Sequence, residues 1–149
     1  MKKIYFDMDG TIANLYGVEN WLDMLRKYNP TPYEQAKVMV NMSQLARVLN
    51  KLQKQGWHIG IVSWLSKCPQ PAYDLLVVNA KYGWLHKHLK SVRFDEIKIV
   101  AHGTPKSTAV LYGGGILFDD EQGNRKEWKG QAYDEKNILE ILKKVSKNA

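Results

Sequence analysis

Two aspartates, Asp7 and Asp9, stand one residue apart at the end of a short apolar run, in the stretch KKIYFDMDGTIANL. Alternate residues of an extended chain point to the same side, so both carboxylates face one way. A second acidic pair, Asp119 and Asp120, ends the apolar run ILF further along the chain. Carboxylates that gather at one place repel each other and stay ionised together only beside a cation. The four aspartates therefore predict a site that holds a positively charged partner.

The residue types around these carboxylates indicate phosphoryl chemistry. Ligands that are all oxygen atoms favour a hard cation, and Mg²⁺ is the cofactor we expect. An aspartate can attack a phosphoryl group to form an aspartyl-phosphate, while a second carboxyl protonates the leaving oxygen and then activates water. A hydroxyl and a lysine hold the remaining phosphoryl oxygens. Ser63 at a predicted strand end and Lys106 at a predicted helix start are the candidates.

Four apolar runs, separated by amphipathic segments, must position these side chains. Strands are expected at 4–6, 57–64, 97–101 and 116–120, and helices at 18–28, 33–42, 43–55, 72–89, 107–112 and 138–145. This alternation predicts one α/β domain over residues 1–149, a three-layer Rossmann-like parallel sheet. Ligands bind beyond the carboxyl ends of such strands, so the polar residues at the strand ends should share one rim.

The composition suits a folded domain with an anionic partner. Hydrophobic residues make up 44% of the chain, and 22 Lys and Arg against 15 Asp and Glu give a net charge of +7. That charge favours a phosphate ester or a nucleic acid, although a solvated lysine-rich surface gives the same balance. The single cysteine, Cys68, excludes a disulfide within this sequence. With no secretion signal and no membrane span apparent, a cytoplasmic protein is expected.

In their order, the motifs resemble those of the haloacid dehalogenase superfamily of phosphohydrolases. The stretch DMDGT at 7–11 matches the first motif, the end of IGIVS at Ser63 the second, Lys106 the third, and ILFDD at 116–120 the fourth. The plainer interpretation of each stretch alone is a turn, a strand-end hydroxyl or a solvated lysine. A non-catalytic member of the fold stays an alternative, although such a member often lacks one of the two aspartates that DMDGT retains.

The resemblance implies a role for each motif residue. Asp7 would be the nucleophile and a metal ligand, and Asp9 the general acid/base with its backbone carbonyl on the metal. Ser63 and Lys106 would bind phosphate, and Lys106 would also counter the charge on Asp7. The remaining expectations are that Asp119 ligates Mg²⁺, that Asp120 does so directly or through water, and that Gly10 and Thr11 contact the substrate.

Three further stretches resemble one branch, the 5′(3′)-deoxyribonucleotidases of type C: SW at 63–64, KYGW at 81–84 and ILFDDE at 116–121. The family lysine in the second stretch contacts substrate, so the resemblance makes Lys81 a substrate-binding candidate. Trp64 is also a substrate-binding candidate, although it stands where the family has a serine that helps to bind phosphate, which is a departure from the pattern. The plainer interpretation of KYGW is a helix with a core tryptophan and solvated lysines.

The segment at 14–42 is expected to form a small helical cap that chooses the substrate. Trp21 and Tyr28 are expected on an apolar helix face, whereas Tyr16 and Tyr33 are freer, and such aromatic side chains can stack on a nucleobase. The resemblance to the deoxyribonucleotidases implies a 5′-(deoxy)nucleotidase, and this is the function we expect. A small cap leaves the site open, so the alternative substrate is a phosphorylated nucleic-acid end or another small phosphate ester. The alternative reaction is transfer of the phosphoryl group to an acceptor other than water. The sequence does not indicate the oligomeric state.

Overall fold

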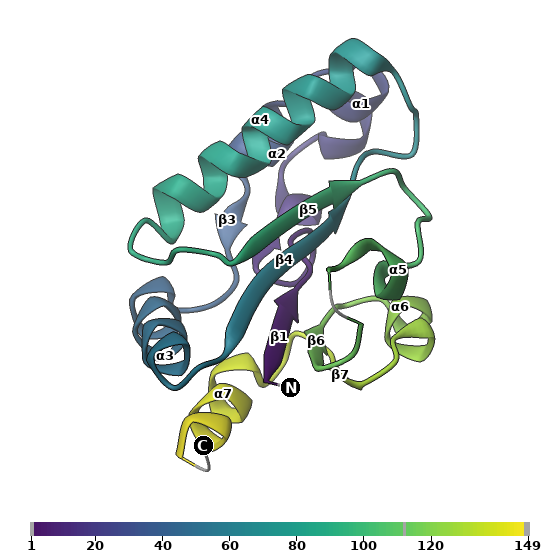
Figure 1. Cartoon of the computed structure of the whole chain (residues 1–149). Helices are drawn as coiled ribbons and strands as arrows, with labels where there is room; N and C mark the ends of the chain where they lie inside the picture. The colour runs from purple at the N-terminus through teal and green to yellow at the C-terminus, as the bar shows by residue number, and fades with distance from the viewer. Residues whose placement is uncertain (1, 112, 148–149) are drawn as a thin grey trace.

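The computed structural model describes residues 2–111 and 113–147 of the chain. Within them, a parallel five-stranded sheet with the order β5-β4-β1-β6-β7 forms the centre of the molecule (Figure 1). Its strands are β1 (Lys3–Phe6), β4 (His58–Trp64), β5 (Glu96–Val100), β6 (Ile116–Phe118) and β7 (Gln131–Tyr133). The predicted strands are confirmed, while β7 was not predicted because three residues at a sheet edge leave no periodic pattern.

Helices cover both faces of this sheet. Alternate strand residues such as Ile4 and Phe6 join a large core with α3 (Met42–Lys54), α4 (Pro71–His88) and α7 (Ile138–Lys147). On the other face, Tyr5 and Leu117 pack in a smaller core beside α5 (Lys106–Ala109) and α6 (Gln122–Glu127). The predicted three-layer α/β fold is thus confirmed. The fifth helix, expected to run to Tyr112, ends at Ala109, because the backbone is extended at Val110; Tyr112 itself lies outside the described residues.

An insertion of short elements lies between β1 and α3. It comprises β2 (Ala13–Asn14), the 3-10 helix η1 (Leu15–Gly17), α1 (Trp21–Arg26), α2 (Thr31–Gln35) and β3 (Lys37–Val38). The strands β2 and β3 pair antiparallel and form a small sheet of their own. In Figure 1 the insertion lies behind α4, and its helix α2 packs against that helix.

Two helix predictions in this insertion need correction. The helix expected at 18–28 spans only Trp21–Arg26, because the backbone is left-handed at Asn20 and Tyr28, with φ of 60° and 58°. The helix expected at 33–42 is wrong: α2 begins at Thr31, where Pro32 suits a first turn, and the chain is extended again by Lys37.

The exposure of two insertion tyrosines is the reverse of the prediction. Tyr28, expected in the core, is 49% exposed, and its ring stands edge-on to Tyr73. Tyr33, expected to be freer, is 4% exposed and packs in a third core cluster with Leu15 and Val77. The helical spacing used for Tyr28 does not apply, because the residue lies beyond the end of α1. Among the described residues, no helix combines the length and apolar composition needed to span a membrane.

Candidate active site

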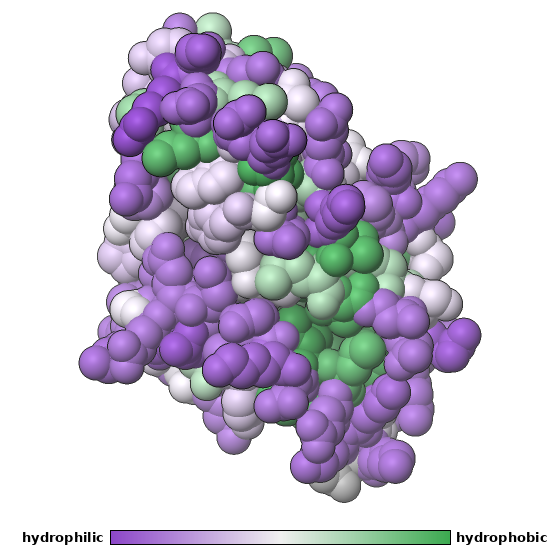
Figure 2. Space-filling model, turned by 180° about the vertical axis from the view of Figure 1, so that it is seen from behind, coloured by the Kyte–Doolittle hydropathy of each residue, from purple (hydrophilic) through white to green (hydrophobic). Residues whose placement is uncertain are grey.

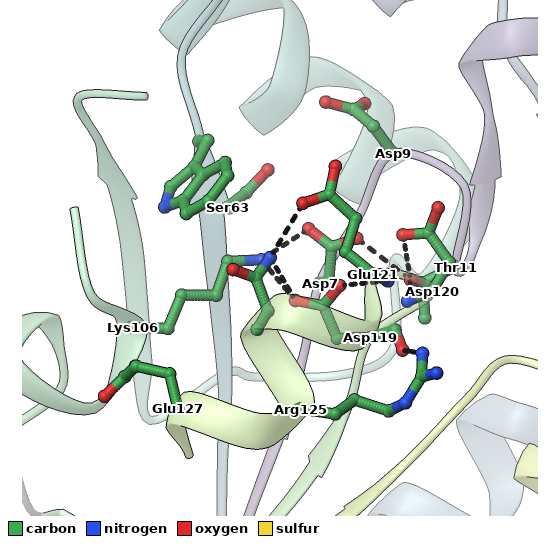
Figure 3. Close-up of polar contacts among 12 residues, drawn as sticks. Asp7, Asp9, Thr11, Ser63, Lys106, Asp119, Asp120, Glu121, Arg125 and Glu127 are labelled. Atoms are coloured by element: carbon green, nitrogen blue, oxygen red, sulfur yellow. Dashed lines mark hydrogen bonds and ion pairs between the residues drawn. The ribbon is translucent and has the colours of Figure 1, made fainter. Parts of the chain in front are cut away.

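The order of the sheet brings the two acidic pairs together. Strand β1 lies between β4 and β6, with Phe6 in register with Phe118, so the residues that follow these strands are neighbours. The backbone N–H of Asp7 donates to the carbonyl of Phe118 at 2.9 Å, one residue before Asp119. Figure 3 shows the side chains of Asp7, Asp119 and Asp120 directed toward one another at this rim. The expected convergence of strand ends is therefore present in the structure.

Lys106 lies at the centre of this rim. Its Nζ donates to Asp7 Oδ1 at 2.8 Å and to Asp119 Oδ2 at 2.7 Å, and the side chain is 1% exposed. Burial disfavours the charged ammonium, but the two carboxylates outweigh burial and raise the pKa of Lys106 above its usual value. Lys106 therefore stays protonated and offsets part of the negative charge of the aspartates.

The carboxylates of Asp7, Asp119 and Asp120 form a cluster that fits a hard divalent cation. One oxygen of each lies within 4.8 Å of the others, and the set consists of oxygen donors only. Burial, followed by repulsion from Asp7, raises the pKa of Asp119 and Asp120. Lys106 pairs with two of the three carboxylates, Asp7 and Asp119, so negative charge remains that a cation would balance. Asp9, also expected at the metal, is not part of this carboxylate cluster.

Gly10 and Thr11 shape the turn that carries these groups. Thr11 Oγ1 lies 2.9 Å from Asp7 Oδ2 and accepts the backbone N–H of Asp120 at 3.1 Å, which ties the first motif to the fourth. Gly10 has φ +82°, and a Cβ there would stand 2.3 Å from Asp120 Oδ2 and 2.9 Å from Tyr16 Cε2. Only glycine fits this turn without displacing the carboxylate. The structure thus gives both residues a place in the framework of the cluster.

Asp9 has a separate lysine partner. Lys81, from α4, donates to Asp9 Oδ2 at 2.9 Å, to Ser63 Oγ at 2.6 Å and to the carbonyl of Trp64 at 2.7 Å. Burial is the largest influence on the pKa of Asp9 and raises it. The charge of Lys81 lowers this pKa and the charge of Asp7 raises it, and the net shift is upward. A carboxyl whose pKa is raised holds its proton closer to neutral pH, which suits a general acid.

A cavity of about 510 Å³ opens over these groups. Asp7, Asp9, Asp120 and Lys106 line its polar end. The insertion contributes one wall, and the segments after β4 and β5 contribute the other. The side chains on these walls include Tyr16, Trp21, Leu25, Tyr33, Trp64, Leu65 and His102.

Aromatic pairs stand on both walls of the cavity. The rings of Tyr16 and Trp21 meet edge-on with centroids 5.0 Å apart, and those of Trp64 and His102 lie 4.7 Å apart. Trp64 also places its ring over Lys106, 5.4 Å from Nζ, and donates its indole N–H to the carbonyl of Thr104. Trp64 therefore contributes an apolar, cation-binding surface where the resembling family has a serine hydroxyl.

The predicted site residues fall into two groups in the structure. Those lining the cavity are Asp7, Asp9, Trp64, Lys106 and Asp120. The others are not among its lining residues and stand behind or beside it: Gly10, Thr11, Ser63, Lys81 and Asp119. Direct contact with substrate, which we expected of Gly10, Thr11 and Lys81, therefore stays a prediction.

Two residues of α6 were missed by the sequence analysis. Asn124 donates to Asp119 Oδ2 at 3.1 Å, and Arg125 donates to the carbonyl of Asp119 at 2.8 Å. Both hold Asp119 from a helix of only six residues that carries no clear apolar periodicity. The signal that marks them is a polar pair five and six residues beyond a strand-end aspartate.

No protein-family model matches the chain, and no curated protein is significantly similar to it. Among solved structures, it is similar to a D,D-heptose 1,7-bisphosphate phosphatase from B. bronchiseptica complexed with magnesium and phosphate. The TM-score is 0.64 and the identity 14%, with 100% of each chain covered. An enzyme of the same name from Burkholderia thailandensis matches with TM-score 0.46 and 10% identity, over 97% of this chain and 98% of that one. The chain therefore has the α/β fold of the B. bronchiseptica phosphatase, with a parallel sheet between helices.

Proposed function

We propose that the protein is a Mg²⁺-dependent phosphomonoester hydrolase of the haloacid dehalogenase type. The observation that carries the proposal is the arrangement of Lys106 between Asp7 and Asp119, with Asp120 beside them and Asp9 held apart. The order of the motifs and the likeness to a phosphatase complexed with magnesium and phosphate support it.

In this proposal, Asp7 is the nucleophile. Its carboxylate attacks the phosphorus, an aspartyl-phosphate forms, and the bond to the leaving oxygen breaks while Asp9 gives that oxygen a proton. Water then attacks the phosphorus of the aspartyl-phosphate, Asp9 takes the proton from that water, and Asp7 is released with inorganic phosphate. Lys106, which lines the cavity, would hold a phosphoryl oxygen and so favour the charge that develops in the transition state. The resemblance assigns the same role to the Ser63 hydroxyl, which lies behind the cavity lining.

Mg²⁺ has a defined place in the proposal. Asp7, Asp119 and Asp120 would hold it, and the resemblance adds the backbone carbonyl of Asp9 as a further ligand. The ion supplies positive charge that lets an anionic phosphate approach an anionic nucleophile. Asn124 and Arg125 keep Asp119 in place for this purpose.

We further propose that the substrate is a 5′-(deoxy)nucleotide and that residues 14–42 act as a small cap. The aromatic pairs on both walls favour a flat, apolar leaving group next to the phosphate, because nucleobases stack on such side chains.

Arg26 and Lys67 also line the cavity, which favours the alternative, a substrate with a second anionic group such as a phosphorylated nucleic-acid end.

A substrate panel with one inactive variant tests the proposal. Nucleoside 5′-monophosphates, sugar phosphates including a heptose bisphosphate, and a 3′-phosphorylated oligonucleotide would be assayed with Mg²⁺ at two salt concentrations. Nucleotides should be hydrolysed fastest, and strong salt sensitivity with the oligonucleotide would favour the alternative. Asp7→Asn should abolish turnover and leave the fold intact. Full activity of that variant would refute the mechanism, and equal activity on all esters would refute the nucleotide preference.

A further inference from the structure

Two buried lysines contact three of the four aspartates of the site. Lys106 contacts Asp7 and Asp119, which belong to the carboxylate cluster, whereas Lys81 contacts Asp9. Figure 3 shows the carboxylate of Asp9 set apart from those of Asp7, Asp119 and Asp120. Without Lys81, mutual repulsion and attraction to one cation would act on all four carboxylates together. The contact between Lys81 and Asp9 therefore calls for a physical explanation.

The hydrogen bonds of Lys81 leave it little freedom to bind anything else. An ammonium group has three N–H donors, and three acceptors surround this one: Asp9 Oδ2, Ser63 Oγ and the carbonyl of Trp64. The side chain is 1% exposed, and Lys81 is not among the residues that line the cavity. The ring of Tyr33, from the insertion, lies 5.1 Å from Nζ and packs beside it.

We propose that Lys81 is a positioning residue that holds the Asp9 carboxylate beside Ser63 and keeps it out of the Asp7–Asp119–Asp120 cluster. Its catalytic consequence rests on the proposed function, whereas the positioning itself is a property of the fold. A half-buried carboxylate that loses the lysine that donates to it must find another cation. The charges of Asp7 and Lys106 act on the Asp9 carboxyl, so the neighbouring cluster already interacts with it electrostatically. Without Lys81, a cation bound at that cluster would draw this carboxylate from proton transfer to metal binding.

The first test compares leaving groups. Lys81→Met removes the ammonium at nearly the same length, and Lys87→Met on the exposed side of the same helix is the matched control. An alkyl phosphate needs a proton on its leaving oxygen, whereas p-nitrophenyl phosphate releases a stable phenolate without one. Lys81→Met should lower kcat/KM about 100-fold for the alkyl ester and less than about 10-fold for the aryl ester. An equal loss for both esters would overturn the proposal, because it indicates direct contact with the phosphoryl group.

A double variant keeps this test decisive if Lys81→Met alone does not fold. Asp9→Asn with Lys81→Met removes both charges, so no unpaired ion is buried. Compared with Asp9→Asn alone, the double variant should have the same kcat/KM for the alkyl ester within about twofold, because Lys81 acts through Asp9. A further large loss would contradict that.

The second test uses Mg²⁺ binding and needs no activity. By titration calorimetry, Lys81→Met should bind Mg²⁺ several-fold more tightly than Lys87→Met, because the Asp9 carboxylate becomes an additional ligand. Adding Asp9→Asn should remove that gain. Unchanged affinity, a gain that persists without the Asp9 carboxylate, or no Mg²⁺ binding at all would each overturn the proposal. If the wild-type protein hydrolyses no phosphate ester, the proposed function fails while this measurement still decides the role of Lys81.

Discussion

Replacing Gly10 with alanine should weaken Mg²⁺ binding much more than it weakens the fold. Gly10 has φ +82°, and a Cβ there would stand 2.3 Å from Asp120 Oδ2, where contacts below 3.0 Å essentially never occur. Gly56 is a matched control, because its φ of +90° imposes the same backbone strain while nothing lies within 4 Å of a Cβ. The two variants therefore differ in whether the new methyl group meets a carboxylate.

The structure sets the size of the loss in unfolding free energy and of the loss in Mg²⁺ affinity. Left-handed backbone costs alanine about 1–2 kcal/mol, and the stiffer unfolded chain returns about 0.4–1 kcal/mol, so each variant should lose about 1 kcal/mol of unfolding free energy. In Gly10→Ala, the Asp120 side chain must also rotate away. This movement relieves its repulsion with Asp7, so the metal-free fold suffers little extra loss, but it takes one of three carboxylates out of the cluster. The loss of a well-placed ligand should lower Mg²⁺ affinity about tenfold or more.

Urea unfolding at several Mg²⁺ concentrations measures this difference. At a concentration about 100 times the wild-type Kd, Mg²⁺ should stabilise the wild type and Gly56→Ala by about 2.7 kcal/mol, and Gly10→Ala by about 1.4 kcal/mol or less. Without Mg²⁺, the two variants should unfold at similar urea concentrations. Equal stabilisation of both variants by Mg²⁺ would refute the inference that Gly10 is required by the position of Asp120.

Three further predictions concern charge, pH and the cavity wall. Lys106→Met should lower kcat/KM by about 100-fold or more, because it removes a donor to the phosphoryl group and leaves Asp119 buried without its ammonium; retained activity in a steady-state assay would contradict this. Burial and repulsion from Asp7 raise the pKa of Asp119 to about 6 and that of Asp120 to about 8, so the native state binds more protons than the unfolded state. In EDTA, the contribution of these groups to stability should therefore be fully present below about pH 4, the pKa of an unfolded aspartate, and be lost progressively as the pH rises through about 6 and about 8. A thermal-melt series in which Asp120→Asn keeps the same dependence would argue against it. Trp21→Ala should raise KM for nucleotides about tenfold and leave KM for small alkyl phosphates within about twofold, which one kinetic comparison measures.

The central sheet and the acidic rim could be predicted because their causes are local in sequence. The apolar runs before Asp7 and Asp119 each form a buried strand, and a parallel sheet places the ends of such strands at one edge. The partner of Asp9 could not be predicted in the same way. Lys81 lies 72 positions from Asp9 in the sequence and contacts it because α4 packs on the sheet. The burial of Tyr33 likewise depends on where the insertion packs. The spacing of apolar residues within the insertion does not indicate that position.

The position of β1 inside the sheet has a consequence for hydrogen exchange. Asp7 follows β1, and Asp119 and Asp120 follow β6; both strands have a paired strand on each side, whereas β5 and β7 form the edges. Amides of inner strands open only with global unfolding, while a two-stranded sheet and short helices open separately and at lower cost. The amides of the insertion should therefore exchange far faster than those of β1. The wall that faces the leaving group can thus open and close many times while the carboxylates beneath it stay in place.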